Sequence, residues 1–493
     1  MDSKSNFIVE RPGKSETDNP LNQGEAHDER STHLFDRGHR AMNAPTLSAP
    51  RSGLETKTEE GDQAMRPGTT TAETWTSLRL LVLAICCLLN ALDGMDIVIF
   101  SYIAPVLIEN WHITPGTMGI IFSASLWGMM IGCLFVAPLA DRFGRRRLML
   151  VMLAVIGCSM IASGLSRTVP ELLATRFAIG IGIGAILASM AALVSEYAPT
   201  NQAGLAVSIE NAGYPLGAVA TGLVAAKLLP IYGWQHLLLG AGMLSLLAFV
   251  LTAALLPESV DFLLSVQPRG ALARANRIIT RLGGHPVQTL PQKPAAARKF
   301  PATAIFGQGR ATGTIALWIG VLTAFMSLYF TISWFTRLAA QAGLALDNAI
   351  YLGSVLNLGA FVGTIAMGGL GRLMGERRVS TCFLVAASLL LVLFGTVHWP
   401  LAGAMAVAFL LGTAIYGGFN SFYALAVGFY PSAIRSTGIG WAMGVGRIGA
   451  AFGPMLGGFL LDHGFSLATI MCVFALPLLI AACCAPFVRI TRV

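Results

Sequence analysis

The sequence is poor in charge, because Asp, Glu, Lys and Arg together make up only 12% of its 493 residues. Ordinary soluble proteins contain roughly 25% charged residues, so this chain lacks the polar side chains that a soluble globule of its length needs. Hydrophobic residues make up 55% of the chain, and its mean hydropathy is +0.67. The scarcity of charge therefore excludes an ordinary soluble class and favours a membrane protein.

Other absences exclude further classes of protein. The eight cysteines lie within apolar runs and none has C-x2-C spacing, so we expect no metal site and no other cofactor. No Walker lysine accompanies the glycine-rich runs, which argues against transport driven by ATP. The apolar runs contain no plausible nucleophile–base set, so we expect no enzyme activity. No basic face is interleaved with aromatic residues, so nucleic acid is not an expected partner.

Apolar runs of about 20 residues recur along the chain, which is the helix length needed to cross roughly 30 Å of hydrocarbon. They form two groups of six, separated by a polar segment. The predicted spans are 78–107, 116–139, 147–165, 171–195, 204–227, 235–256, 314–337, 349–371, 379–397, 402–426, 437–461 and 467–487. We therefore expect an all-α integral membrane protein with twelve transmembrane helices in two pseudo-symmetric six-helix halves.

Changes in composition along the chain predict the boundaries of its parts. Residues 1–75 are polar, rich in Pro and Gly and without apolar periodicity, so we expect a disordered tail rather than a secretory signal. The N-terminal half is predicted at 76–257, a polar connecting segment at 258–312 and the C-terminal half at 313–488. Residues 489–493 form a short C-terminal tail.

Basic residues are concentrated in alternate connections between the predicted spans. One set contains Arg142, Arg145, Arg146, Arg147, the arginines and lysines of 258–312, Arg372, Arg377, Arg378, Arg435, Arg489 and Arg492. The opposite set contains little beyond Arg167, Lys227 and Arg337. Because Lys and Arg are enriched in cytoplasmic loops, we predict a multi-pass protein of the inner (plasma) membrane with both termini in the cytoplasm. We expect it to be a monomer in the lipid bilayer.

Two short connections indicate that the halves are related by a repeat. The connection between the second and third spans (137–147) and that between the eighth and ninth (368–378) are both basic and contain glycine. Repeats of this kind place a binding site at the interface of the halves near the middle of the membrane, and rocking of the halves gives alternating access.

Two aspartates lie inside the first predicted span. Asp93 and Asp96 are three residues apart, so they share one helical face, and Gly94 between them permits close helix contact or local unwinding. Two carboxylates in a dry interior repel one another, which favours a proton on at least one of them. This pair suits proton coupling or gating; the alternative is a structural polar cluster paired with a basic residue.

Two arginines inside spans are candidates for charge recognition. Arg447 lies about three turns into the eleventh span among glycines, and its guanidinium offers a bidentate match to a carboxylate. We predict that it binds an anionic group of the substrate, with a salt bridge to Asp93 or Asp96 as the alternative. Arg176 in the fourth span is either an interior residue of a proton relay or a side chain that extends to the outer interface.

Aromatic and amide side chains complete the predicted site. Phe330 and Trp334 lie beside Tyr329 in the seventh span, where they either stack on a planar ligand or form an interfacial aromatic belt. Asn420 and Tyr423 in the tenth span are weaker candidates of the same kind. Glu196 and Glu210, at the cytoplasmic ends of the fourth and fifth spans, are candidates for gating or structural pairs with loop arginines; we assign Glu196 to the gate.

The first basic connection resembles the loop motif G-x-x-x-D-R-x-G-R-R of the major facilitator superfamily. Here the motif contains Asp141, Arg142, Gly144 and Arg145, with Ala137 in place of its first glycine. The resemblance implies a major facilitator fold and a gating role for these four residues. The second copy has Arg372 where the acid belongs, which puts its own gating role in doubt.

Shorter motifs resemble the aromatic acid:proton symporters of that superfamily. They are Asp93-Gly94-Met95-Asp96 followed by Pro105, Ser333-Trp334, and the eleventh-span series from Arg435 to Gly458. The resemblance covers about residues 75–490 and implies proton-coupled uptake of benzoate, hydroxybenzoates or related acids, in which Asp93, Asp96, Asp141 and Arg142 are important. The alternatives are a proton-coupled exporter of drugs or metabolites with the same fold, and a membrane receptor that does not transport.

Overall fold

A computed structural model of the chain describes residues 74–291, 305–307, 309–431 and 434–488. The regular structure of these residues is entirely helical. The predicted N-terminal tail lies outside the described residues, apart from its last two positions. Lys293, Arg298, Lys299 and the C-terminal tail at 489–493 also lie outside them.

The N-terminal half contains the first six spans. Its helices are α1 (Ser77–Trp111), α2 (Pro115–Ile131), α3 (Ala140–Phe143), α4 (Arg145–Leu165), α5 (Val169–Tyr197), α6 (Ala203–Asn211) and α7 (Gly213–Leu255). A π-helical turn (Gly132–Val136) and a 3-10 turn (Ala137–Leu139) join α2 to α3, so the second span continues past its predicted end at 139. α7 is broken at Gly233, where φ is 75° and ψ is 172°, which separates the fifth span from the sixth.

The C-terminal half contains the other six spans. Its helices are α10 (Ala311–Gln341), α11 (Leu346–Met374), α12 (Glu376–Thr396), α13 (Leu401–Phe429), α14 (Arg435–Asp462) and α15 (Leu467–Cys484). Among the described residues, 11 helical segments are long and apolar enough to cross a membrane. One of these, Ala203–Leu255, has 53 residues and contains the break at Gly233, so it crosses twice and the predicted twelve spans are accounted for.

The predicted polar connection between the halves contains two short helices that the sequence analysis did not anticipate. They are α8 (Val260–Val266) and α9 (Ala271–Arg281). Along α9, Ala271, Ala275 and Ile279 are buried at intervals of four residues, whereas Arg274 and Arg277 are exposed. This spacing gives α9 one apolar and one basic face, and its apolar face packs on α8.

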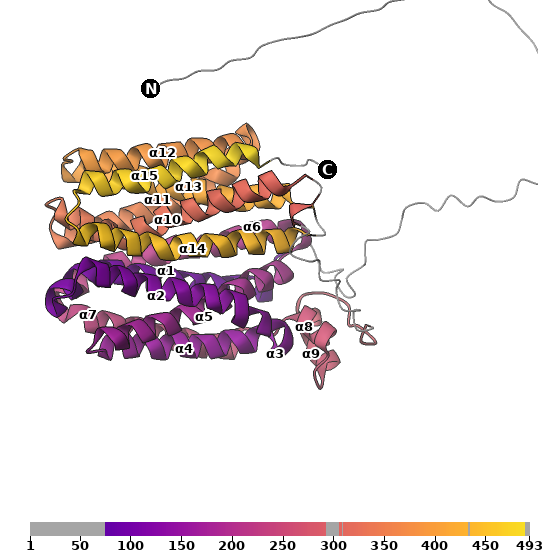
Figure 1. The fold of residues 1–493 in the computed structure, drawn as a ribbon. Helices are drawn as coiled ribbons and strands as arrows, with labels where there is room; N and C mark the ends of the chain where they lie inside the picture. The colour runs from indigo at the N-terminus through magenta and orange to yellow at the C-terminus, as the bar shows by residue number, and fades with distance from the viewer. Residues whose placement is uncertain (1–73, 292–304, 308, 432–433, 489–493) are drawn as a thin grey trace, which may run out of the picture. The chain divides into compact units, whose positions relative to one another are not determined.

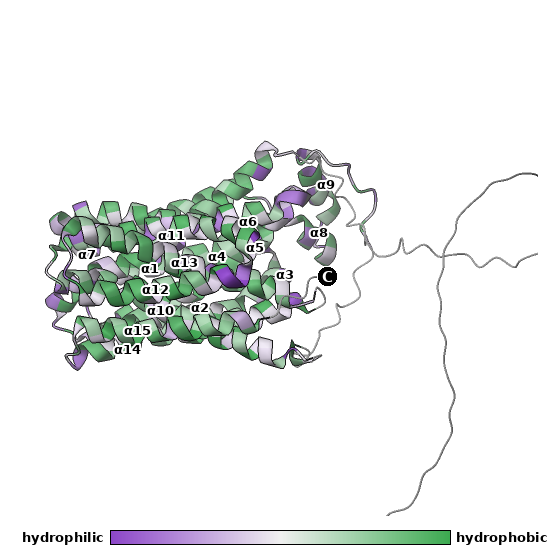
Figure 2. Cartoon of the chain, turned by 90° about the horizontal axis from the view of Figure 1, so that it is seen from above, coloured by the Kyte–Doolittle hydropathy of each residue, from purple (hydrophilic) through white to green (hydrophobic). Residues whose placement is uncertain are grey.

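The bundle presents apolar side chains on its outer surface. Figure 2 shows that the hydrophobic colouring continues along the lengths of the long helices, while hydrophilic residues gather in the connections and in α8 and α9. Exposed side chains on the long helices include Leu223, Val224, Leu247, Val250 and Leu389. Such a surface is suited to hydrocarbon, in which only fully hydrogen-bonded elements such as helices are stable.

The two halves meet along three pairs of helices: α2 packs on α14, α7 on α11, and α1 on α10. The first of these pairs can be followed in Figure 1, where α2 and α14 run alongside one another. Small residues make the contact close, because a Cβ added to Gly458 of α14 would lie 2.5 Å from the carbonyl oxygen of Pro115.

The backbone repeats itself at equivalent places in the two halves. Gly144 joins the second span to the third with φ 102° and ψ 139°, and Gly375 joins the eighth to the ninth with φ 86° and ψ 135°. Residues with side chains rarely adopt this region, so glycine is required at both corners. The shared conformation supports the repeat that the two basic connections predicted.

Candidate functional site

Asp93 and Asp96 lie inside the bundle, as predicted for charges within a span. Their side chains are 7% and 1% exposed, and the Oδ1 atom of each has no hydrogen-bond partner among the described residues. Both line a small cavity between α1, α4 and α5 that has room for about one water molecule. The helix stays intact at Gly94, where a Cβ would lie 2.1 Å from the carbonyl oxygen of Tyr214 on α7, so this glycine serves close helix contact rather than unwinding.

Arg176 of α5 lies in the interior and does not extend to the outer interface. It is 2% exposed, and its Nη1 atom donates to the backbone carbonyl of Asp96 at 3.2 Å. Its guanidinium carbon is 3.8 Å from the centroid of the Phe100 ring. The side chain thus lies beside Asp96 without an ion pair to its carboxylate, since Arg145–Glu196 is the ion pair found between described residues. The Asp96 carboxylate can therefore gain or lose a proton without breaking a salt bridge.

Glu210 adds a third acidic side chain to this region, and its partner differs from the predicted loop arginine. It is 2% exposed, and the Asn90 side-chain amide donates to its Oε1 atom at 3.0 Å and to its backbone carbonyl at 2.9 Å. Asn90, Asp93 and Asp96 are spaced three apart on α1 and so follow one face of the helix. Through its hydrogen bonds to Asn90, Glu210 at the end of α6 is thus joined to the helix face that contains the aspartate pair.

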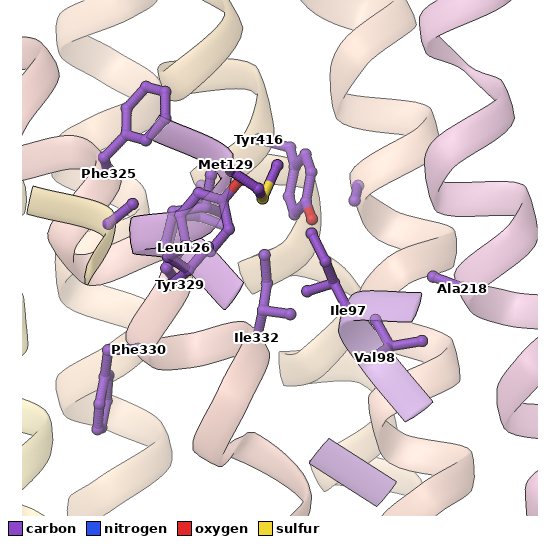
Figure 3. Close-up of a cluster of buried hydrophobic side chains, with 14 of the residues drawn as sticks. Ile97, Val98, Leu126, Met129, Ala218, Phe325, Tyr329, Phe330, Ile332 and Tyr416 are labelled. Atoms are coloured by element: carbon purple, nitrogen blue, oxygen red, sulfur yellow. The ribbon is translucent and has the colours of Figure 1, made fainter. Parts of the chain in front are cut away.

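Arg447 lies at the interface of the halves among aromatic rings. Its Nη1 atom donates to the Tyr329 hydroxyl at 3.0 Å and lies 3.8 Å from the sulfur of Met129, which belongs to α2 in the other half. The ring of Phe325 is stacked on Tyr329 at a centroid distance of 5.8 Å, and the guanidinium carbon is 5.7 Å from the Phe325 centroid. Figure 3 shows Phe325, Tyr329 and Met129 on the same side of the view. The salt bridge from Arg447 to Asp93 or Asp96, which was the alternative to anion binding, is not formed in this conformation.

Two rings of α13 extend this arrangement. Phe419 lies edge-on to Phe325 at 4.6 Å, and Tyr423 lies edge-on to Phe419 at 5.7 Å. We call Arg447, Phe325, Tyr329, Phe419 and Tyr423 the Arg447 cluster. Phe325 and Phe419 were missed in the sequence analysis, but each precedes a tyrosine by four residues on its own helix, a spacing that places both rings on one face.

Three predicted substrate-binding residues are not brought to the Arg447 cluster. Trp334 is fully buried, donates to the Pro454 carbonyl at 2.9 Å and lies edge-on to Phe122. Phe330 stacks on Phe474 of α15, and Figure 3 shows it apart from Phe325 and Tyr329. Asn420 donates to Thr364 of α11 at 2.9 Å. In this conformation these side chains pack helices against one another, so Arg447 and its neighbouring rings carry the proposed substrate site.

The predicted gate lies where α3, α4, α5 and α8 meet. Arg145 pairs with Glu196 at 2.7 Å, and the same carboxylate accepts hydrogen bonds from the Ser259 hydroxyl at 2.6 Å and the Asp261 amide at 3.0 Å. Arg145 and Glu196 thus anchor the start of α8 to the N-terminal half. Asp141 and Arg142 are exposed, and in this conformation the Asp141 carboxylate makes no hydrogen bond or ion pair with the described residues.

The contacts between the halves are concentrated at one end of the bundle. Between described residues, the hydrogen bonds that cross the interface include Gly116–Asp462, Ser123–Ala451, Ser101–Thr336 and Arg447–Met129. All lie at the level of Arg447 or beyond it, away from α8 and α9. Toward α8 and α9, a Cβ added at Gly440 or Gly444 of α14 would meet no neighbouring atom within 4 Å. These hydrogen bonds between the halves thus gather toward the end opposite α8 and α9.

A helical membrane protein with two repeated halves and a charged site between them has the architecture of a carrier. Residues 86–422 match the family model of the Major Facilitator Superfamily, and the chain belongs to this family. The family and the similar proteins described next are transporters, so this chain is a multi-pass membrane transporter and not an enzyme.

Curated relatives with aromatic acids in their names cover most of the chain. The gallate transporter of Pseudomonas putida is 30% identical over 406 residues, which are 82% of this chain and 90% of that protein. The 4-hydroxybenzoate transporter PcaK of Pseudomonas aeruginosa is 31% identical over 81% of this chain and 90% of that protein. The benzoate transport protein of Acinetobacter baylyi is 30% identical over 77% of this chain and 83% of that protein. The predicted resemblance to aromatic acid transporters is confirmed.

Solved structures share the fold. The inward-open conformation of the xylose transporter XylE from Escherichia coli matches with a TM-score of 0.66 and covers 84% of this chain and 97% of that chain. The sequence identity is 16%, so this likeness concerns the arrangement of helices alone.

Proposed function

We propose that the chain imports a small aromatic carboxylate together with protons across the inner membrane, by alternating access. The observation that carries this proposal is the position of the Arg447 guanidinium among aromatic rings at the interface of the halves. The substrates named for the relatives (gallate, 4-hydroxybenzoate and benzoate) support the same class of ligand. Both halves belong to one chain, so a monomer contains a complete site.

Recognition of an aromatic acid requires a cation and flat apolar walls, and the Arg447 cluster offers both. A guanidinium binds a carboxylate through two parallel hydrogen bonds, and Arg447 uses one nitrogen on the Tyr329 hydroxyl in this conformation. Phe325 and Phe419 offer ring faces and edges for offset or edge-on contacts with a benzene ring. Tyr423 and Tyr329 offer hydroxyls that suit the ring substituents of hydroxybenzoates.

Proton coupling is assigned to Asp93 and Asp96, with Arg176 holding Asp96 in place. A carboxylate anion that enters a cell is opposed by the inside-negative potential, by about 2.3 kcal/mol per 100 mV. A proton that moves with the anion cancels its charge, and the pH gradient then drives uptake. The two aspartates have properties that suit a proton carrier, because they are buried and neither forms a salt bridge with another described residue.

The orientation follows from the basic connections. The positive-inside rule assigns the end with α8 and α9 to the cytoplasm. The hydrogen bonds between the halves gather at the other end, which supports a conformation open to the cytoplasm. Asp141, Arg142, Gly144, Arg145 and Glu196 form the proposed gate at this end. We expect Asp141 to gain a partner when the end closes, which would stabilise the opposite conformer.

Uptake of radiolabelled benzoate, 4-hydroxybenzoate and gallate tests this function in cells expressing the full chain, with and without a protonophore. Accumulation of at least one acid that collapses with the protonophore is the expected result. The matched control is the Arg447→Ala variant at equal membrane abundance, which should not accumulate the acid. Efflux of the acids driven by the proton gradient would support the exporter instead, and failure to move any of the three acids would contradict the proposed substrate class.

A further inference from the structure

A second cavity lies outside the bundle interior, between the start of α4 and the two short helices α8 and α9. Its volume is about 380 Å³. Arg146 and Arg147, in the first turn of α4, form one wall, and Arg274 and Arg277 of α9 form another. The transport steps proposed above do not use these four side chains.

The charges in this cavity are unbalanced. The acidic side chain that lines it is Glu258, whose Oε1 atom already accepts hydrogen bonds from the backbone amides of Arg146 at 3.0 Å and Ser259 at 3.1 Å. The side chains of Arg147, Arg274 and Arg277 make no hydrogen bond or ion pair with other described residues. Guanidinium groups from two separate segments thus face one space in which Glu258 is the acidic lining residue, and this excess of positive charge favours an anion with several acceptor oxygens.

The position of the cavity indicates where such an anion comes from. Arg147 belongs to the first turn of a membrane-spanning helix, so the cavity lies where α4 enters the bilayer. Close by in the sequence, Phe143 is 51% exposed and Leu139 is 39% exposed, as expected for side chains in contact with lipid. Phe262, Leu263 and Pro268 also line the cavity and offer an apolar wall beside the arginines. A ligand with a phosphate group and an apolar body fits these surroundings better than a free ion does.

We propose that this cavity binds the phosphate headgroup of an anionic phospholipid. The phosphate oxygens bind Arg147, Arg274 and Arg277, and the glycerol and upper acyl region lie against Phe262 and Leu263. Anionic lipids populate the cytoplasmic leaflet, to which basic segments beside a span are attracted. The bound headgroup links α9 to α4 and so holds the connecting segment against the N-terminal half.

Lipid titration of the purified full-length chain tests this site. The measurement is the affinity for phosphatidylglycerol, with phosphatidylcholine and inorganic phosphate as separate arms, read by native mass spectrometry in detergent. The test variant is R274Q/R277Q, and the matched control is R269Q/R281Q. The control removes the same charge from the neighbourhood of α9 at two exposed arginines that do not line the cavity. Arg147→Gln probes the opposite wall independently of α9.

The expected result is tight binding of phosphatidylglycerol to the native chain and to the control, and binding about thirtyfold weaker for R274Q/R277Q. Arg147→Gln should weaken binding as well. Equal losses of lipid affinity in the test and control variants would show that basic residues attract the lipid in general, which would overturn the proposed site. Equal binding of phosphatidylcholine would overturn the requirement for an anion, and binding of inorganic phosphate as tight as that of the lipid would overturn the lipid assignment.

Discussion

A buried carboxylate oxygen without a hydrogen-bond partner is costly, roughly 1–3 kcal/mol or more for a charged group. Asp93 and Asp96 each contain such an atom inside the bundle. Burial destabilises a protonated carboxyl group less than a carboxylate, and neither aspartate has a salt bridge to another described residue. Each side chain is therefore suited to accept a proton. This arrangement does not favour the stability of the fold, but it suits a side chain that binds and releases a proton.

Substitution of either aspartate by asparagine tests proton coupling separately from substrate binding. Asp93→Asn and Asp96→Asn keep the shape of the side chain but cannot exchange a proton. We expect uphill uptake to fall until the accumulation ratio is about one, because the pH gradient no longer drives the cycle. Exchange of internal for external substrate should persist. Full accumulation by both variants would remove the coupling role from this pair.

Arg447 should contribute both charge and geometry to substrate binding. Truncation of one partner in a desolvated charge pair costs roughly 2–5 kcal/mol, so Arg447→Ala should raise the substrate KM or Kd at least about thirtyfold. Arg447→Lys keeps the charge and loses the bidentate match, so its affinity should be intermediate. Binding of labelled acid to purified protein measures both. Native affinity in the alanine variant would place the anion site elsewhere, with Arg176 as the next candidate.

Glu210 is predicted to relay protons between Asp93 and the open end of the bundle. Glu210→Gln preserves an oxygen that can accept the Asn90 hydrogen bond but removes the proton exchange. We expect the rate of uphill uptake to fall about tenfold or more and its dependence on external pH to change. Glu210→Asp, which can still titrate, should retain more activity. A glutamine variant with the native rate and pH profile would leave Glu210 with a structural role only.

At the scale of helices, the contact between α2 and α14 depends on the absence of side chains. A Cβ at Gly458 would approach the Pro115 carbonyl oxygen to 2.5 Å, so Gly458→Val should push the two helices apart at the closed end. We expect transport to fall several-fold because the conformer open to the α8–α9 side is destabilised. Gly240→Val on α7 is the control, since a Cβ there meets nothing within 4 Å. Uptake rates at equal membrane abundance provide the comparison, and equal rates for both variants would argue against a role for this contact in the cycle.

The spans could be predicted from sequence because hydrocarbon tolerates few structures, and about 20 apolar residues suffice to recognise a crossing helix. The short helices α8 and α9 were not predicted. In α9 the buried residues Ala271, Ala275 and Ile279 give a pattern of only three positions among many charges, too short to distinguish from a polar loop.

The candidate site could be predicted only in part from the sequence. Charges within spans identify buried polar positions directly, so Asp93 and Arg447 were found. Aromatic residues are common on every face of a membrane helix, and the sequence does not indicate which face meets the other half. Tyr329 contacts Arg447, whereas its neighbour Phe330 stacks against Phe474 of α15.

At the scale of the whole molecule, the proposed cycle exchanges one set of contacts between the halves for another. The set described here closes the end opposite α8 and α9 through Gly116–Asp462 and Ser123–Ala451. At the α8–α9 end, the Asp141 carboxylate has no hydrogen bond or ion pair with a described residue. Opening the closed end costs these hydrogen bonds, and new contacts at the α8–α9 end must offset the loss if both conformers are to be populated.

The driving force of this cycle can be measured on the whole protein in proteoliposomes. One proton for each monovalent acid moves no net charge, so a membrane potential alone should leave uptake unchanged, whereas each uncompensated charge would be driven by about 2.3 kcal/mol per 100 mV. We expect an acidic exterior to drive accumulation of 4-hydroxybenzoate with the potential clamped at zero by potassium and valinomycin. Neutral aromatic acids also cross lipid unaided, so initial rates are compared with protein-free vesicles and with vesicles containing Asp93→Asn. Accumulation driven by an inside-negative potential at equal pH would show that more than one proton accompanies each acid, and both Asp93 and Asp96 would then be expected to release a proton in every cycle.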